Sequence, residues 1–313
     1  SFGLTQVIAA PVFAATKLMI NYLRFVAQNL AKIPFALSCV GFRYFLIWIV
    51  AALLLIAFCL IMYKERLRIR FVSLICIFML LVSAVTWKVV DRNVVELAVI
   101  GDGSGFCCVI RKNNNCVLIG CLSEYDERTF ISNYLLSRGI DNPDVIIMPT
   151  ALDNVAGGFR SVVDFYKCDT VVAPLNRLTD DIKKSSVDFE MCELENALMT
   201  FYNDITVRSV PNEYGCALVV KHGNKTCLIS SCSGNYEDYC EKIGGVDLII
   251  TPPVITTGVA INSTTKMVFA GDSERSGEII NKLNLENNKV VLTDGNRVIA
   301  RFKGTSDIKI IRE

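Results

Sequence analysis

Few side chains in this 313-residue sequence could bind a metal ion or transfer a proton at one shared site. Asp102 and Asp153 lie close to the ends of two predicted strands, and Cys121 and Cys232 lie at the ends of two others. Carboxylates, thiolates and imidazoles are the side chains that bind zinc or manganese. The single histidine, His222, lies in a predicted hairpin turn, where an imidazole is usually solvated. These residues offer at most a sparse metal or acid–base site.

A structural role accounts for the same residues. Asp102 and Asp153 have the type and position of turn or helix-capping residues. The run GDGSG has no Lys or Ser/Thr at P-loop spacing behind it, so it only weakly indicates a phosphate site. Four glycines suit tight turns and close backbone packing, namely Gly101, Gly103, Gly157 and Gly158.

The thirteen cysteines indicate neither a zinc site nor a disulfide framework. No C-x-x-C pair occurs, and a structural zinc site would normally use one. A bridge between Cys232 and Cys240 is one alternative. Five others lie inside strand-like runs, where cysteine usually behaves as a small buried hydrophobe: Cys107, Cys108, Cys116, Cys216 and Cys227.

The elements that would position these residues centre on the segment 139–174. The run DVIIMP predicts a strand buried on both faces, and a second strand, DTVVAP, closes the unit. Between them, Phe159, Val162, Val163 and Tyr166 are spaced for one face of a helix. This pattern predicts a βαβ crossover with its loop at the carboxyl edge of the sheet, where α/β folds usually place their sites.

Short strands and helices alternate along the rest of 88–313. Hairpin or turn residues are expected at 113–114, 222–224 and 294–295. Helices are predicted at 123–138, with Gly139 after the last turn, and near 236–243 and 273–283. The remaining strands are predicted within 94–100, 106–110, 116–121, 199–204, 205–211, 216–222, 225–231, 247–252, 266–271, 289–293 and 297–302.

The first 87 residues have the composition of a membrane region. A polar stripe predicts an amphipathic helix over about 11–32, and the uncharged runs at about 44–63 and 71–87 predict two transmembrane helices. The basic loop KERLRIR between them favours a cytoplasmic loop. We therefore expect a multi-pass membrane protein with an extracytoplasmic domain at 88–313. Because the chain begins at Ser1 without a signal peptide, we also expect it to be a piece of a longer protein.

The charge of the two regions differs in sign. Residues 1–87 contain eight basic residues and one acidic residue, and the whole chain has a net charge of +1, so residues 88–313 carry a net charge of −6. Such a domain has no bulk basic surface to hold nucleic acid.

The crossover resembles the first metal motif of metallo-β-lactamase-fold hydrolases, Thr-His-x-His-x-Asp-His-x-Gly-Gly after a hydrophobic strand. The ligand-bearing part of that motif falls on Met148, Pro149, Ala151, Asp153 and Asn154, and only the aspartate is kept. The resemblance implies a four-layer αββα sandwich. It does not imply the family's zinc or manganese, because proline and alanine side chains offer no donor.

The whole chain is similar to the C-terminal part of ComEC-type competence proteins, which are membrane channels for DNA uptake. The family's Asp-Val-Gly-Gln-Gly-Asp stands here as VIGDGS at 99–104, and its Leu-Ile-Asp-Thr-Gly stands as LIGCL at 118–122, with Gly120 in place of the aspartate. Its later Gly-Asp, His-His-Gly-Ser and His-Pro motifs fall near 230–232, 251–253 and 276–277. None of these segments keeps a metal ligand.

This resemblance implies a membrane-anchored, non-catalytic domain without a cofactor, which would meet single-stranded DNA through a channel lying upstream of this chain. Two alternatives stay open. One is a residual metal-dependent hydrolase with an altered site around Asp153, with Asn154 and Asp102 as its other candidates. The other is a membrane-tethered interaction module unrelated to DNA. The sequence indicates no oligomeric state.

Overall fold

The computed structural model describes most of the region after residue 93 and only short pieces before it. The described residues are 50–54, 74–79, 81–82, 85, 94–101, 105–122, 127–177, 189–232, 234–235, 245–252, 256–257, 261–271, 276–277, 280, 289–304 and 306–313. The predicted amphipathic helix at 11–32 lies outside them, as do most residues of the two predicted transmembrane helices. Within the described residues, no helix is long and apolar enough to cross a membrane.

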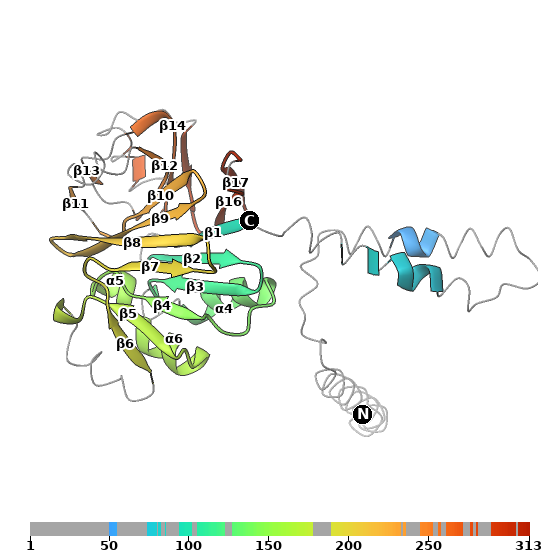
Figure 1. The fold of residues 1–313 in the computed structure, drawn as a ribbon, viewed down its shortest axis with the longest axis horizontal. Helices are drawn as coiled ribbons and strands as arrows, with labels where there is room; N and C mark the ends of the chain where they lie inside the picture. The colour runs from blue at the N-terminus through green and yellow to red at the C-terminus, as the bar shows by residue number, and fades with distance from the viewer. Residues whose placement is uncertain are drawn as a thin grey trace, which may run out of the picture.

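The described part of the C-terminal region is built on two large β-sheets that face each other (Figure 1). Sheet A has the strand order β17-β16-β1-β2-β3-β4-β5-β6. Pairing is antiparallel from β17 to β3 and parallel from β3 to β6. Its strands are β1 (Val95–Ile100), β2 (Cys107–Lys112), β3 (Asn115–Ile119), β4 (Val145–Ile147), β5 (Thr170–Ala173), β6 (Glu190–Glu193), β16 (Val298–Phe302) and β17 (Lys309–Arg312).

Sheet B has the order β15-β14-β12-β10-β9-β8-β7, and β10, β12, β14 and β15 are parallel. A separate parallel pair is formed by β11 (Gly234–Asn235) and β13 (Thr256–Thr257). The strands of sheet B are β7 (Leu198–Phe201), β8 (Ile205–Asn212), β9 (Gly215–His222), β10 (Lys225–Ile229), β12 (Val246–Thr251), β14 (Ile261–Phe269) and β15 (Val290–Leu292).

Alternation along the strands fills the space between the sheets with apolar side chains. In β1, Val95, Leu97 and Val99 join the core shared with sheet B, whereas Ala98 and Ile100 point to the opposite face. Residues of both sheets form this shared core, from Val117 and Ile119 in sheet A to Leu218 and Ile250 in sheet B. Every residue of β1 is buried, because both faces of sheet A are covered.

Two helices cover the outer face of sheet A, α4 (Glu127–Ser137) and α6 (Phe159–Tyr166) (Figure 1). The four apolar residues predicted to share one face of a helix do so. All four are buried in the core between α6 and the outer face of sheet A: Phe159, Val162, Val163 and Tyr166. Gly139 follows α4 at φ +66, the left-handed conformation that favours glycine after a helix. The predicted crossover from β4 through α6 to the parallel β5 is therefore confirmed.

The outer face of sheet B also carries an apolar core, which includes Val219, Ile249 and Phe269, with Ile280 packed against it. Residues 276, 277 and 280 are helical, in agreement with the helix predicted at 273–283. The rest of that helix and the one predicted near 236–243 lie outside the described residues. The described layers are helix, sheet and sheet, and they confirm the predicted two-sheet α/β architecture.

Several boundaries differ from the predictions. One continuous helix after the crossover loop was expected, but α5 (Asp153–Ala156) is separated from α6 by Gly157 and Gly158. The edge strands β6 and β17 were not predicted, since they are short and half exposed. The turn predicted at Asp294 and Gly295 between the last two predicted strands is confirmed. The strands do not pair as a hairpin, because β15 lies in sheet B and β16 in sheet A, so the turn joins the two sheets.

Candidate functional site

The candidate site lies where the carboxyl ends of the parallel strands meet. Two contacts tie the sheets together at this edge. The Thr293 hydroxyl, after β15, donates to the Gly101 carbonyl, after β1, at 2.7 Å. The Cys216 N–H, in β9, donates to the Pro149 carbonyl, after β4, at 2.7 Å. The strand ends of both sheets therefore face one region, as a site of this fold class requires.

The loop that carries Asp153 and Asn154 is held by backbone hydrogen bonds. The Asn154 carbonyl accepts from the Phe106 N–H at 2.8 Å, and the Val155 carbonyl accepts from the Cys121 N–H at 2.6 Å. The Asp153 side chain is exposed in the first turn of α5, where a negative charge suits the helix end. The residue that caps α5 is Leu152, so the expectation of Asp153 as a capping residue was wrong.

The other positions of the first motif are occupied by non-ligands that pack. Met148 is fully buried in the core under the helices. Gly215 lies so close to the Pro149 and Thr150 backbone that an added Cβ would come within 2.3 Å of the Pro149 carbonyl oxygen. The Thr150 hydroxyl donates to the Tyr214 carbonyl at 2.6 Å. The start of β9 therefore packs directly against the crossover loop at Pro149 and Thr150.

Neutral hydroxyls and a thiol occupy the strand ends of sheet B. Ser230, Ser231, Cys232 and Thr251 are all buried. The Ser230 hydroxyl donates to the Cys232 carbonyl at 2.7 Å, and the Thr251 hydroxyl donates to the Pro252 carbonyl at 3.0 Å. Burial raises the pKa of the Cys232 thiol, which keeps it protonated and a poor metal ligand.

Gly120 shows why the site of the resembling family does not fit here. It stands in the place of that family's aspartate, directly after β3, and has φ +74. A Cβ at this position would lie 2.7 Å from the Phe106 carbonyl oxygen and 3.1 Å from a Val155 methyl group. The backbone around Gly120 has no room for any side chain, so a carboxylate could enter only if the neighbouring segments moved.

The other glycines of the motifs differ in whether a larger residue could replace them. At Gly101 an added Cβ would lie 2.7 Å from the Gly105 carbonyl oxygen and 3.0 Å from the Ala270 side chain, so close packing is confirmed there. Gly157 and Gly158 have φ values of −55 and −80, which any residue adopts. Asp102 and Gly103 lie outside the described residues.

His222 is far from this edge. It ends β9 and pairs with Lys225, the first residue of β10, whereas Ser230 follows the last residue of β10. Five strand residues separate the two positions by roughly 16 Å. The residue is 6% exposed and its ring packs against Phe302, so the expectation of a solvated histidine was wrong.

Within the described residues, no three His, Cys, Asp or Glu side chains come close enough together to hold a metal ion. The cysteines predicted to be buried inside strands are all buried, and burial raises the pKa of Cys116 and Cys216 to about 12. Cys240 lies outside the described residues, so the alternative of a bridge to Cys232 stays a prediction.

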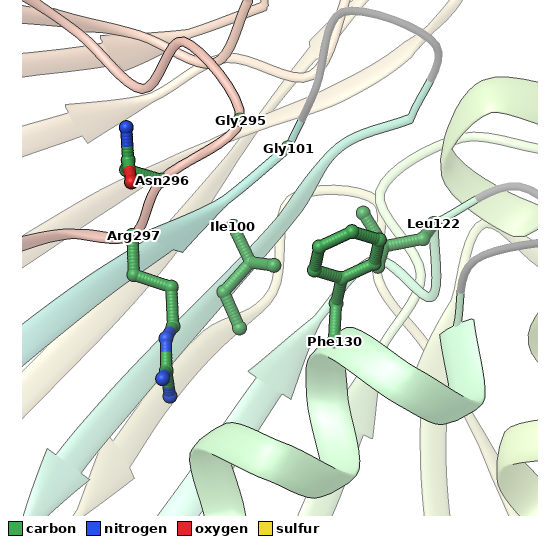
Figure 2. A pocket seen from close by; sticks show the side chains of 7 residues that line it. All are labelled: Ile100, Gly101, Leu122, Phe130, Gly295, Asn296 and Arg297. Carbon is green, nitrogen blue, oxygen red and sulfur yellow. The ribbon is translucent and has the colours of Figure 1, made fainter. Parts of the chain in front are cut away.

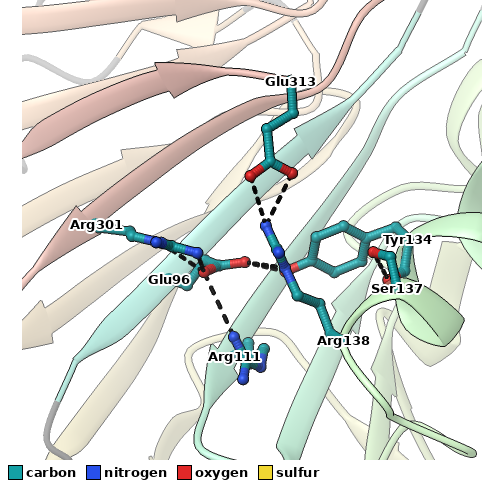
Figure 3. Close-up of polar contacts among 7 residues, drawn as sticks. All are labelled: Glu96, Arg111, Tyr134, Ser137, Arg138, Arg301 and Glu313. Atoms are coloured by element: carbon teal, nitrogen blue, oxygen red, sulfur yellow. Dashed lines mark hydrogen bonds and ion pairs between the residues drawn. The ribbon is translucent and has the colours of Figure 1, made fainter. Parts of the chain in front are cut away.

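A charged cluster that the sequence did not reveal lies on the outer face of sheet A (Figure 3). The Glu96 carboxylate is 2% exposed and accepts from Arg138 Nε at 2.9 Å, Arg301 Nε at 2.8 Å and the Tyr134 hydroxyl at 2.8 Å. Arg111 approaches it at 3.5 Å. The one available signal was a glutamate inside the apolar run 94–100, because a charge there must be paired.

Comparisons with known proteins place the chain by fold similarity alone. No known family model and no curated protein matches the sequence. The similar solved structures include the metallo-β-lactamase fold protein YhfI from Bacillus subtilis, at 10% identity and TM-score 0.45, covering 71% of this chain and 100% of that one.

Two further similar structures are Igni18 and a diphosphatase. Igni18, a metallo hydrolase from the archaeon Ignicoccus hospitalis, has 10% identity and TM-score 0.46, and the similarity covers 67% of this chain and 100% of that one. A diphosphatase from the PhnP family has 13% identity and TM-score 0.44, covering 67% and 99%. At such identities and TM-scores these similarities assign no activity to the chain and no role to its residues.

Proposed function

We propose that the region from residue 94 onward is a non-catalytic domain built on a metallo-β-lactamase-type sandwich. The spans predicted at 44–63 and 71–87 tether it to the membrane, and it serves a competence-type DNA-uptake channel. It contributes its fold and surfaces, and the chemistry of the resembling hydrolases is lost.

The observation that carries the loss of catalysis is the packing around Gly120. A single substitution of an aspartate would leave a space in which the carboxylate could be restored. Here the Phe106 carbonyl and the Val155 side chain occupy the volume that a Cβ would need. The backbone around Gly120 therefore does not leave room for the missing ligand, which supports the proposed loss of the metal centre.

The strand ends of sheet B support the same proposal. The side chains described there are neutral, and several are bonded to the local backbone, as Ser230 is to Cys232 and Thr251 is to Pro252. A metal ion needs negative or strongly basic donors to offset its lost hydration. Asp153, the one retained family ligand, is exposed in α5, so it favours no residual hydrolase.

The roles in DNA uptake and at the membrane rest on the resemblance of the sequence motifs and on the two apolar runs before residue 88. The net charge of −6 after residue 87 argues against strong binding of a DNA strand by bulk electrostatics. We therefore propose that the domain acts by position, by shielding or guiding a single strand close to the membrane. Any direct binding of single-stranded DNA would be weak and would fall steeply with salt.

The first test concerns metal and hydrolysis. The full chain, purified in detergent, is incubated with zinc or manganese, desalted and subjected to elemental analysis, and is then assayed with a chromogenic phosphodiester. We expect no stoichiometric metal and no hydrolysis above the protein-free rate. Gly120→Asp should not restore metal binding, and should instead unfold the domain at lower temperature. Stoichiometric metal with an activity that Asp153→Asn removes would overturn the proposal.

The second test concerns DNA uptake. Cells carrying the intact chain, the chain without residues 94–313, or Asp153→Asn are compared for internalised labelled DNA at equal membrane protein levels. We expect loss of uptake only for the truncated chain. Unchanged uptake on truncation would favour a tethered module unrelated to DNA, whereas loss in Asp153→Asn would mean that its carboxylate still does chemistry.

The third test concerns topology. Native cysteines are replaced, and a single cysteine is placed either at Asn114, an exposed residue of the hairpin between β2 and β3, or at Arg68 in the basic loop. An impermeant maleimide applied to intact cells should label the first and spare the second. The reverse pattern would put the domain in the cytoplasm and contradict the proposed arrangement.

A further inference from the structure

A small cavity lies beside the candidate site, between sheet A and α4. Figure 2 shows Arg297 on one side of it and Phe130 of α4 on the other, with Ile100 between them. Gly101, Leu122 and the turn residues Gly295 and Asn296 complete the lining. The enclosed volume is about 10 Å³, enough for about one water-sized group.

Arg297 is the charged residue of this cavity, and its backbone is held in place. Its N–H donates to the Glu313 carbonyl at 3.0 Å, and its carbonyl accepts from the Glu313 N–H at 2.8 Å. Its neighbours alternate, with Val298 in the core between the sheets and Ile299 in the core under the helices. By the same alternation the Arg297 side chain lies on the outer face of sheet A, as Ile299 and Arg301 do.

One nitrogen of the Arg297 guanidinium has no acceptor among the described residues. Its Nη1 atom is buried and has no hydrogen-bond partner within the described part of the chain. A buried donor of a charged group without a partner is costly, and native structures rarely leave one without a function. Arg301, which lies in β16 on the same face as Arg297, donates to Glu96. Of these two arginines, Arg297 is therefore the one with an unpartnered buried nitrogen among the described residues.

The surrounding charge favours an anion. On this face, Arg111, Arg138 and Arg301 meet the carboxylate of Glu96, and Arg138 also meets Glu313. Within the described residues of this cluster, three guanidinium groups thus face two carboxylates before Arg297 is counted, and the nearby Asp294 is exposed to solvent. Arg297 adds a further positive charge next to the apolar side chains of Ile100, Leu122 and Phe130, where electrostatic attraction is screened less than in water.

We propose that Arg297 and this cavity bind one oxyanion group, a phosphate or a carboxylate, of a ligand whose remainder lies in solvent. The fork of a guanidinium matches two oxygens of such a group. The cavity has room for about one of these two oxygen atoms. The binding requires neither a metal nor hydrolysis, so it is independent of the proposed loss of catalysis.

The test uses the full chain purified in detergent and measures Tm during titration with sodium phosphate or sodium acetate, at an ionic strength held constant with sodium chloride. A ligand that binds the folded state raises Tm as its concentration rises. We expect a saturating rise in the wild-type chain. Arg297→Gln should weaken the apparent affinity at least about tenfold, because a charge-assisted bidentate contact is lost. Arg297→Lys should weaken it less.

The matched control is Arg208→Gln, which removes an exposed arginine from β8 in the other sheet and changes the net charge equally. It should leave the titration unchanged. A rise with phosphate alone assigns a phosphate ligand, and a rise with acetate as well assigns the oxyanion in general. No rise above that with chloride, or the same rise in Arg297→Gln, would overturn the proposal.

A second measurement does not depend on the folding of a variant. Phenylglyoxal modifies arginine side chains, and the extent of modification of Arg297 in the wild-type chain can be followed by peptide mass spectrometry. Phosphate should protect Arg297 and leave Arg208 unprotected. Equal protection of both residues would contradict a site at Arg297.

Discussion

The outer face of sheet A and the carboxyl edge shared by the two sheets differ in the charge of their buried side chains. On the outer face, three arginines and a tyrosine converge on the buried Glu96 carboxylate. Among the described residues at the carboxyl edge, the buried polar side chains are neutral, as those of Ser230, Ser231 and Thr251 are. A metal-dependent hydrolase concentrates its charge at the edge, whereas this domain places its concentrated charge where it joins secondary-structure elements.

The Glu96 cluster joins elements that are distant in the sequence. Glu96 lies in β1, Arg111 in β2 and Arg301 in β16, while Arg138 follows α4 and reaches Glu313 at the chain end at 2.9 Å (Figure 3). Burial alone would raise the pKa of the Glu96 carboxyl, but Arg138, Arg301 and Arg111 together lower it below its usual range. The carboxylate therefore stays charged and connects α4 to sheet A.

The largest predicted effect follows from breaking this cluster. Glu96→Gln leaves the buried guanidinium groups without their carboxylate, so the free energy of unfolding should fall by about 3 kcal/mol. Urea denaturation of the full chain in detergent, followed by far-UV circular dichroism, measures the change. Glu190→Gln removes an exposed carboxylate from the edge strand β6 and should change stability by less than about 0.5 kcal/mol.

Equal effects of the two substitutions would remove the contrast. The cluster would then be a set of weak surface contacts, despite the 2% exposure of Glu96.

The second prediction breaks the packing at the carboxyl edge. In Gly215→Ala the new methyl group would overlap the Pro149 carbonyl oxygen, which it would approach to 2.3 Å. The start of β9 must move away from the crossover loop, at a cost of about 2 kcal/mol. Gly277→Ala is the matched control, because nothing lies within 4 Å of the Cβ added there. Thermal unfolding of both variants provides the comparison, and a Gly215→Ala variant as stable as the control would mean that this edge is loosely packed.

The third prediction is the pH dependence of the same stability. The pKa of Glu96 is lowered in the folded state, so its stabilisation is fully present above the unfolded-state pKa, near the model-compound value of 4.5, and is lost as the pH falls through the folded-state pKa. Wild-type unfolding free energy should therefore decline below about pH 4.5 more steeply than that of Glu96→Gln. Parallel curves between pH 3 and pH 7 would show that Glu96 contributes nothing to acid sensitivity.

The sequence predicted the local parts of this fold well. The strand predicted within 94–100 and the helical spacing of Phe159, Val162, Val163 and Tyr166 depend on neighbours a few residues apart, and the structure confirms both. Gly139 was identified from its position after a helix, and its φ of +66 confirms the reason. These features follow from local backbone and burial patterns, which the sequence displays directly.

The long-range parts could not be predicted. The arginine partners of Glu96 lie 15, 42 and 205 positions away, and no local pattern pairs them. The path from β15 in one sheet to β16 in the other looks like a hairpin in sequence, because Asp294-Gly295 is a hairpin signal. The crowding at Gly120 depends on Phe106 and Val155, so it appears only when three segments are placed together.

The smallest predicted effect sharpens the comparison most. Asp153 is the one residue kept from the metal motif of the resembling family, yet its side chain is exposed in a helix of one turn. Asp144, in the same crossover, has structural partners: its carboxylate accepts from the Cys116 N–H and from the Tyr202 hydroxyl, both at 2.8 Å. The aspartate that matches the family motif and the aspartate that holds structural hydrogen bonds are therefore two different residues, nine positions apart.

Asp153→Asn should change the free energy of unfolding by less than about 0.5 kcal/mol, whereas Asp144→Ala should lower it by about 1–2 kcal/mol through two lost hydrogen bonds. Chemical denaturation of both variants, with DNA uptake measured at equal protein levels, tests the pair. If Asp153→Asn proved the more damaging in either measurement, the carboxyl edge would still depend on a charge. The contrast between a neutral edge and a charged outer face would then fail at Asp153, the residue that matches the family's metal motif.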